Sequence, residues 1–435
     1  MGLSSESARR SAVIGALLGV ATFAVYMAGS NRSFGYDAAA TFANFIATPS
    51  IWDAFAVRTV IPTIPIEQVA TNDHVLLSLL SHLVYTATGS RSEVVYRVLP
   101  ALAAGATVGI STGVLTRRFG LVAGVCGGLF IATDPLFVDN SRDVRGYSLA
   151  ALGAVAGTLL LERRRLIAYT LAMGLAIAAQ LFVLVVLLCH IAWRWRRWRE
   201  LSGAWITAAA IGFAANASIY YIELTRHGLP PPYFNPTFPR DTVLFLVGAP
   251  VLLPVGLWLA TAGLGLWTQR REAWLWSSLA VLVAVVAILW LVIRPAFLYP
   301  RFFVFLVPAI GFLMAAAVQR WWVLAPLVVV GAVASVVGQA PTYLVDPLAL
   351  PQAAAVADRM EAEGKTVCVL HSDEQELAAY TNQFAIVTAA GQLGGCDAVV
   401  VVSWNVDLGL RDEAARELPK LTTLPAYYPA VVLKR

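Results

Sequence analysis

The chain has 435 residues, of which 59% are hydrophobic and 13% are charged, whereas an average soluble domain has about 25% charged residues. Its mean hydropathy is +0.71. These values exclude an ordinary soluble globular protein and predict a polytopic membrane protein. The net charge of +5 therefore reflects the placement of basic loops before it reflects any anionic partner, and nothing in it indicates nucleic-acid binding.

The first long apolar run covers residues 11–29 and follows Arg9 and Arg10. It is longer than the apolar core of a signal peptide and lacks a convincing cleavage site. We therefore expect an uncleaved first transmembrane helix whose N-terminal end lies in the cytosol.

A first outer segment, residues 30–92, is too long to be a simple connector. It opens with FGYDAA, so Asp37 follows directly on the first helix. There the carboxylate could face a water-filled cavity, or it could cap a helix that begins at Ala38. Further along, TNDHVLLSLLSH supplies Asp73 and His74.

Polar residues in the second half of this segment recur at helical spacing. The stripe consists of His74, Ser78, Ser81, His82 and Tyr85, with leucine and valine between them. Such a pattern predicts an amphipathic helix that lies flat in the membrane interface with its polar stripe in water.

Basic clusters at 116–120, 161–166, 193–200, 268–272 and 319–322 mark cytosolic loops. Helices are then expected near 93–115, 121–137, 147–161, 202–222, 241–267, 273–293, 302–318 and 323–340. Residues 166–192 are too few for two full spans, so we expect two short helices or a re-entrant pair, broken near 174–180. The total is about eleven spans, which places the C-terminus outside.

Ionisable residues gather at the outer ends of several of these helices. They are Glu93, Arg97, Asp143, Arg145, Arg294 and Arg301. A single residue of this kind is a cap or an interfacial anchor. Several guanidinium groups gathered with carboxylates indicate a site for a phosphorylated ligand, because the arginine fork matches phosphate geometry.

Asp143, in the loop SRDVRGY, has three interpretations. It could bind a substrate, assist a metal, or pair with Arg142 or Arg145 to hold the loop. His74 together with Asp37 and Asp143 could also form a site for a divalent metal, although no metal-ligand spacing supports it.

From about residue 341 the chain changes character. Twelve of its 26 acidic residues follow this point, and short apolar runs such as KTVCVL alternate with a helix-like AAAVADRMEAEG. We expect two domains: 1–340 in the membrane, and 341–435 as a small soluble α/β domain outside it. Cys368 and Cys396 in that domain could form a disulfide or remain two thiols.

Several short motifs occur in a characteristic order. They are YDA after the first helix, NDHVLLSLL, GSRSEVVYR, RRFG, an Asp-Pro pair at 134–135, SRDVRGYSL, and PRF before a late helix. Over about residues 11–320 this order resembles the GT-C superfamily of membrane glycosyltransferases, in the branch of the bacterial protein O-mannosyltransferases and aminoarabinose transferases. The resemblance implies an α-helical polytopic fold of the GT-C type.

The resemblance also implies an activity: transfer of a sugar from a polyprenyl-phosphate donor to an extracytoplasmic acceptor hydroxyl, at the bacterial inner membrane, with the lipid tail in a groove among the helices. Asp37 stands where the family has its proposed base, and Arg97 stands at a proposed phosphate contact. Many members carry a second acid directly after the base, where this chain has Ala38.

One carboxylate suffices for this chemistry, because a phosphate leaves without the protonation that a sugar alkoxide needs. The resemblance and this chemistry together assign Asp37 as the general base. Asp143 is kept as a second acid. The donor phosphate would contact Arg97, Arg145, Arg294 and Arg301, and the substrate loops would contribute Asp73, His74 and Tyr147. We assign no cofactor, and a divalent metal stays an open alternative.

The alternative is a non-catalytic transporter, flippase or binder of polyprenyl-linked sugars. A transporter of this size often shows repeats with broken helices at corresponding positions. The chain has one short broken pair and no matching one, and its long first outer segment and soluble tail favour an enzyme.

Overall fold

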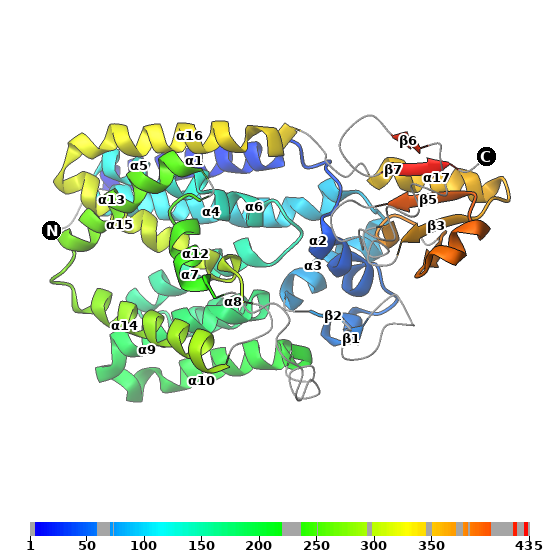
Figure 1. Ribbon diagram of the computed structural model, residues 1–435. Helices are drawn as coiled ribbons and strands as arrows, with labels where there is room; N and C mark the ends of the chain where they lie inside the picture. The colour runs from blue at the N-terminus through cyan, green and yellow to red at the C-terminus, as the bar shows by residue number, and fades with distance from the viewer. Residues whose placement is uncertain are drawn as a thin grey trace. The chain divides into compact units, whose positions relative to one another are not determined.

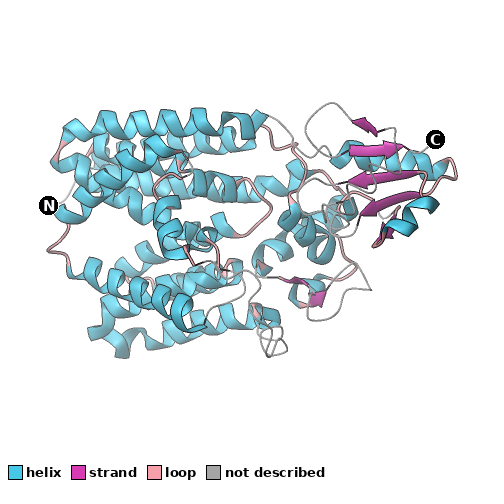
Figure 2. Cartoon of the chain, in the orientation of Figure 1, coloured by secondary structure: helices cyan, strands magenta, loops and turns pink. Residues whose placement is uncertain are grey.

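The computed structural model describes residues 5–58, 70–72, 74–219, 236–249, 251–293, 298–344, 350–370, 377–381, 383–401, 421–423 and 430–433. Helices make up most of what it describes (Figure 2). The chain forms two compact units. The first comprises Met1–Ala28, Asp73–Leu77 and Arg97–Pro341, and the second comprises Gly29–Asn72, Ser78–Tyr96 and Thr342–Arg435.

The first unit is a bundle of apolar helices (Figure 1). Its α-helices are α1 (Ser5–Met27), α4 (Glu93–Phe119), α5 (Leu121–Thr133), α6 (Pro135–Ser141), α7 (Tyr147–Glu162), α8 (Leu166–Ala179), α9 (Leu184–Arg194), α10 (Trp198–Ala215), α12 (Phe238–Phe245), α13 (Leu252–Thr268), α14 (Ala273–Ala287), α15 (Val307–Arg320) and α16 (Ala325–Leu344). Shorter helical turns are η4 (Leu181–Val183), η5 (Trp195–Arg197), η6 (Ile288–Ile293), η7 (Pro300–Leu306) and η8 (Trp322–Leu324). The first turn of α4 belongs to the second unit.

Five described segments are long and apolar enough to cross a membrane: Glu6–Met27, Glu93–Phe119, Ala273–Ile293, Pro300–Arg320 and Trp322–Ala340. A sixth arises if α5 and α6, which meet at a bend of 57°, form one broken span. The most apolar window of Ala273–Ile293 has none of its residues buried, as suits a helix that faces lipid. The predicted eleven spans include shorter apolar helices, so that number stays a prediction.

The structure confirms one expected helix break and shows a second break that the sequence did not predict. The break within 166–192 is confirmed: α8 ends at Ala179, and the side-chain oxygen of Gln180 accepts a hydrogen bond from the backbone N–H of Phe182 at 3.2 Å. The single helix expected over 241–267 is wrong. Gly248 separates α12 from α13 with φ +106°, and a β carbon there would lie 2.8 Å from the Trp258 ring.

The second unit combines the first outer segment with a small α/β fold. Its N-terminal part holds α2 (Tyr36–Thr41), η1 (Phe42–Ile46), η2 (Ile51–Phe55), the two-stranded β1 (Val57–Arg58) and β2 (Ala70–Thr71), and most of α3 (Val75–Thr88). Its C-terminal part holds α17 (Leu350–Ala362), β3 (Val367–Leu370), β4 (Ala385–Val387), η9 (Ala390–Gly395), β5 (Ala398–Val401), β6 (Leu421–Thr423) and β7 (Ala430–Leu433).

The C-terminal strands form one mixed sheet in the order β4-β3-β5-β7-β6. Strand β3 pairs in parallel with β4 and β5, and β7 pairs antiparallel with β5 and β6. Helix α17 packs against β3 through Ala353 and Ala357, which are buried with Val369. The expected α/β character of this region is confirmed.

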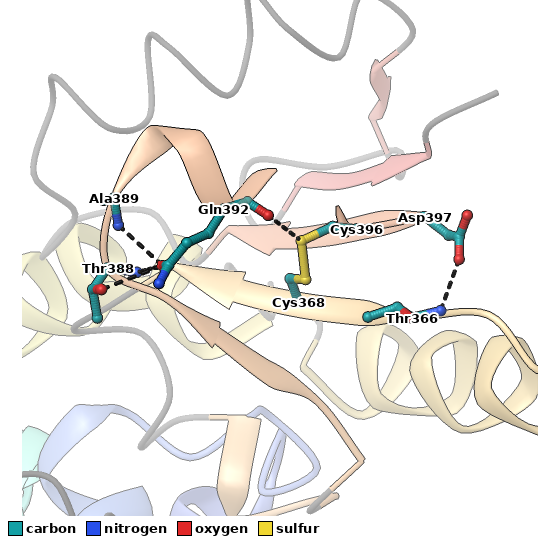
Figure 3. Close-up of a disulfide and its surroundings, with 7 residues drawn as sticks. All are labelled: Thr366, Cys368, Thr388, Ala389, Gln392, Cys396 and Asp397. Atoms are coloured by element: carbon teal, nitrogen blue, oxygen red, sulfur yellow. Dashed lines mark hydrogen bonds between the residues drawn. A yellow bond between two sulfur atoms is a disulfide. The ribbon is translucent and has the colours of Figure 1, made fainter. Parts of the chain in front are cut away.

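The two cysteines of the sheet are joined. Cys368 in β3 and Cys396 just before β5 form a disulfide, with their Cα atoms 5.9 Å apart (Figure 3). Nearby, the backbone N–H of Thr366 donates to Asp397 Oδ2 at 2.8 Å. Disulfides persist in oxidising compartments, which agrees with the extracytoplasmic placement expected for this domain.

Helix α3 is amphipathic as expected, but its polar stripe does not face water. Ser78, Ser81 and His82 are buried, whereas Leu83 and Val84 are exposed. The Nδ1–H of His82 donates to the carbonyl oxygen of Ile46 at 2.9 Å. The prediction of a wet polar stripe is therefore wrong: hydrogen bonding within the protein satisfies the imidazole, and the outward side of the helix is apolar.

Replacing Cys368 and Cys396 together by alanine should destabilise the α/β fold by about 2–4 kcal/mol, because the disulfide restricts the unfolded chain. Proteolysis of the detergent-purified protein, followed by mass spectrometry of cleavages after residue 350, measures the effect. The free cysteine Cys126 provides the control, since Cys126→Ala should leave these cleavages unchanged. Equal resistance of the double variant and the wild type would contradict the expected role.

Candidate active site

The loop SRDVRGY is tied to the end of the first helix. Arg142, which is 2% exposed, follows the last residue of α6. Its Nε donates to the carbonyl oxygen of Tyr26 at 3.2 Å and its Nη2 to that of Ala28 at 2.6 Å. These carbonyls belong to the C-terminal turn of α1 and the residue after it, where helical partners run out. Arg142 therefore has a structural task that the sequence did not reveal.

His74 and Tyr147, both predicted to belong to the substrate loops, are in contact within the first unit. His74 is fully buried, and its ring meets that of Tyr147 edge-on with centroids 4.7 Å apart. Its Nδ1–H donates to the carbonyl oxygen of Ala179 at 2.8 Å, at the end of α8. In the neutral ring Nε2 is then the acceptor nitrogen. Three segments far apart in the sequence therefore meet at this imidazole.

Gly146 is required by this packing. Its φ of −77° is ordinary, so backbone freedom is not the reason. A β carbon at this position would overlap the carbonyl oxygen of Ala179 and lie 3.0 Å from His74 Nδ1. A side chain would therefore disturb the hydrogen bond that orients the imidazole. In the sequence, the only sign of this role is that Gly146 directly precedes a predicted helix.

Asp143 does not hold the loop by pairing with arginine. Its Oδ1 accepts a hydrogen bond from the backbone N–H of Val144 at 2.9 Å. The ion pairs found among the described residues do not include Asp143, which speaks against the third interpretation, a pairing with Arg142 or Arg145. The carboxylate is partly exposed, which leaves it accessible to a polar ligand.

Three of the four predicted phosphate contacts lie in the first unit. Arg97, on α4, is 3% exposed, whereas Arg145 and Arg301 are partly exposed. Arg301 lies on η7, which packs against α6 and α7, the two helices that flank SRDVRGY. Its guanidinium carbon lies 4.8 Å from the centre of the Tyr299 ring. Arg294 and Asp73 lie outside the described residues.

Asp37 lies in the second unit, on the first turn of α2. The helix begins at Tyr36 and its N-cap is Gly35, with φ −71° and ψ 168°. The interpretation of Asp37 as the cap of a helix beginning at Ala38 is therefore wrong. Its side chain is partly exposed, so the carboxylate is within reach of solvent.

Metal binding finds no support in the described part of the chain. No group of three or more histidine, cysteine, aspartate or glutamate side chains that could hold a metal occurs there. His74 is engaged with a backbone carbonyl through Nδ1.

No protein-family model matches the sequence, and no curated protein matches it. A solved structure does: the crystal structure of ArnT from Cupriavidus metallidurans bound to undecaprenyl phosphate. That structure matches over 96% of this chain and 97% of its own, with a TM-score of 0.58 and 16% sequence identity. The chain has the GT-C fold.

This likeness confirms the predicted fold class, an α-helical polytopic membrane protein of the GT-C type with a small C-terminal α/β fold. It extends over nearly the whole chain, whereas the sequence motifs covered about residues 11–320. At 16% identity the likeness shows a shared fold and does not extend to activity, since one fold hosts many activities.

Gly146→Ala should destabilise the first unit by about 1–3 kcal/mol, the usual cost of overpacking. Gly203, within α10, is the matched control, since a β carbon there meets nothing within 4 Å. Gly203→Ala should be neutral or stabilise by up to about 1 kcal/mol, because alanine favours the helix. Thermal unfolding of both variants in detergent measures the difference, and equal midpoints would contradict the packing role of Gly146.

Proposed function

We propose that this protein is an inverting glycosyltransferase that moves a sugar from a polyprenyl phosphate to an acceptor hydroxyl of the bacterial cell envelope. The observation that carries the proposal is the likeness over 96% of the chain to a structure that was solved with undecaprenyl phosphate bound. A polyprenyl-phosphate sugar presents two features to recognise, an anionic phosphate and an apolar tail. The first unit offers guanidinium groups and an apolar helical surface.

Asp37 is the general base in this proposal. It accepts the proton of the acceptor hydroxyl as the oxygen attacks the anomeric carbon. The bond from that carbon to the phosphate oxygen breaks, and its electron pair leaves on the phosphate. A single displacement of this kind inverts the configuration. The partial exposure of Asp37 supports this role.

Arg97, Arg145 and Arg301, together with Arg294, hold the phosphate as its negative charge grows. Arginine suits this task because its planar fork gives two hydrogen bonds to adjacent phosphate oxygens. Arg142 is left out of the set because it binds the carbonyl oxygens of Tyr26 and Ala28.

The remaining predicted residues bind the sugar or the acceptor. In this proposal Asp143 accepts hydrogen bonds from hydroxyl groups, and Asp73, His74 and Tyr147 belong to the substrate loops. The reaction takes place on the extracytoplasmic side of the inner membrane, with the N-terminus in the cytosol and the C-terminus outside. The Cys368–Cys396 disulfide supports that orientation, since it requires an oxidising compartment.

Asp37→Asn should lower kcat by about 10²–10⁴, the usual contribution of a general base, with donor binding retained. Asp53→Asn is the matched control. Asp53 lies in the same outer segment, but its carboxylate accepts from the backbone N–H of Ser50 at 3.3 Å and pairs with Arg58. The assay supplies radiolabelled polyprenyl-phosphate sugars one at a time, with a crude envelope fraction as acceptor.

Release of label by the wild type and by Asp53→Asn, but not by Asp37→Asn, is the expected pattern. Undiminished turnover by Asp37→Asn would remove it as the base. Donor binding without cleavage of any sugar, with the acceptor fraction shown to be competent, would favour a transporter or binding protein instead.

Arg301→Gln should raise KM for the donor by about 10-fold or more, because a hydrogen bond to a charged group contributes about 1.5–3 kcal/mol. The partial exposure of Arg301 makes the substitution tolerable for folding. Arg163→Gln is the control, since Arg163 is exposed in a predicted cytosolic loop. The same donor titration serves both variants, and an unchanged KM for Arg301→Gln would exclude it from the phosphate site.

A further inference from the structure

We propose that the C-terminal α/β fold holds the segment that carries Asp37, and that Tyr380 is the positioning residue through which it does so. The proposal deepens the proposed function, since it takes Asp37 as the base. Every residue on which it depends belongs to the second unit.

Tyr380 is anchored within the α/β fold by its own turn. Its backbone N–H donates to the carbonyl oxygen of Leu377 at 2.9 Å, and Leu377 is buried in the core that α17 and β3 share. The next residue, Thr381, donates through Oγ1 to Asp358 Oδ1 on α17 at 2.6 Å. The Tyr380 ring also packs against that core. The backbone of Tyr380 is thus fixed by the fold around it.

The hydroxyl of Tyr380 bridges two parts of the outer segment. It accepts a hydrogen bond from the backbone N–H of Phe34 at 2.7 Å and donates one to Glu93 Oε1 at 2.5 Å. A phenol can donate one hydrogen bond while it accepts another. Phe34 lies three residues before Asp37, and Glu93 is the first residue of α4. One hydroxyl therefore ties the start of the Asp37 segment to the start of a helix.

Aromatic packing extends this attachment across α2. The rings of Tyr380 and Phe34 lie 5.6 Å apart, and Phe34, which is fully buried, stacks on Phe42 at 5.1 Å. Phe34 precedes α2 and Phe42 follows it, so the helix that carries Asp37 is held at both of its ends by one stack. A displacement of Phe34 would move both ends.

Two further hydrogen bonds join the same parts. The backbone N–H of Leu350 donates to Ser33 Oγ at 2.8 Å, and Arg91 Nη1 donates to the carbonyl oxygen of Ala379 at 3.1 Å. Ser33 is the direct neighbour of Phe34. The attachment therefore uses the start of α17 as well as the Tyr380 turn. Two separate points of attachment restrain the outer segment from rotating on the α/β fold as well as from moving away from it.

Position matters here because catalysis is steep in distance. A misplacement of about 1 Å can lower a rate about 10²-fold, and three peptide units separate Phe34 from Asp37. Loss of the Tyr380 hydroxyl releases the Phe34 N–H and leaves the rings in contact. The effect should therefore appear in kcat, through Asp37, rather than in donor binding.

The experiment compares Tyr380→Phe with Asp397→Ala in the full-length protein. Asp397→Ala removes the hydrogen bond from the Thr366 N–H, which is internal to the α/β fold and does not involve the Tyr380 turn, so it controls for loss of stability there. Hydrogen exchange of peptides that cover residues 33–46 and steady-state kinetics are measured on both. In Tyr380→Phe alone we expect exchange at least 10-fold faster, kcat lower by at least 10-fold, and KM for the donor within 2-fold of the wild type.

Unchanged exchange in Tyr380→Phe would overturn the proposal, because the segment would not depend on the hydroxyl. Faster exchange with unchanged kcat would overturn the positioning role. Equal losses in both variants would overturn it as well, since they would show general instability. If the wild type transfers no sugar, the proposed function fails, and exchange alone then decides whether Tyr380 holds the segment.

Discussion

Hydrocarbon offers no hydrogen-bond partner, and this constraint acts on the first unit at three of its helix ends. At the bend between α5 and α6, Asp134 Oδ1 accepts from the backbone N–H of Phe137 at 3.0 Å. At the break after α8, the side chain of Gln180 caps the turn that follows. At the end of α1, the guanidinium of Arg142 binds two carbonyl oxygens. Each of these three ends has a polar side chain that binds the backbone.

The same constraint explains where the candidate site forms. A helix end presents unsatisfied carbonyl groups, and polar side chains gather where they can satisfy them. His74 binds the last carbonyl of α8 and meets Tyr147 at the start of α7. Polar groups at such ends divide into those that complete the backbone and those that remain for a ligand. Arg142 belongs to the first kind, and in our proposal Arg145 and Arg301 bind the donor phosphate.

The second unit is stabilised differently, because its sheet is small. A disulfide joins β3 to the residue before β5, and the pairing of α17 with β3 supplies a compact cluster of small residues. On that base the fold presents Tyr380 to Phe34 and Glu93. In our proposal the α/β fold acts through the segment that it holds.

The sequence by itself determined the membrane class, the break at Gln180, the small α/β fold and the resemblance that the GT-C fold later confirmed. The first three follow from composition and from hydropathy along the chain, and the resemblance follows from the order of short motifs; all of these are local properties. The sequence also showed that Asp37 directly follows the first helix and that Asp143 lies in a polar loop between two apolar runs. It misjudged the stripe on α3, because periodicity shows that one face differs from the other without showing which face the protein covers.

Only the tertiary structure decided which polar residues are already engaged. In SRDVRGY nothing distinguishes Arg142, and only the fold shows that it donates to carbonyl oxygens at the end of α1, more than a hundred residues earlier in the chain. Gly146 is required because Ala179 and His74 crowd it, and Tyr380 bonds to Phe34 and Glu93, which lie hundreds of residues before it. Such contacts join residues with no relation in sequence spacing, so no local pattern could have indicated them.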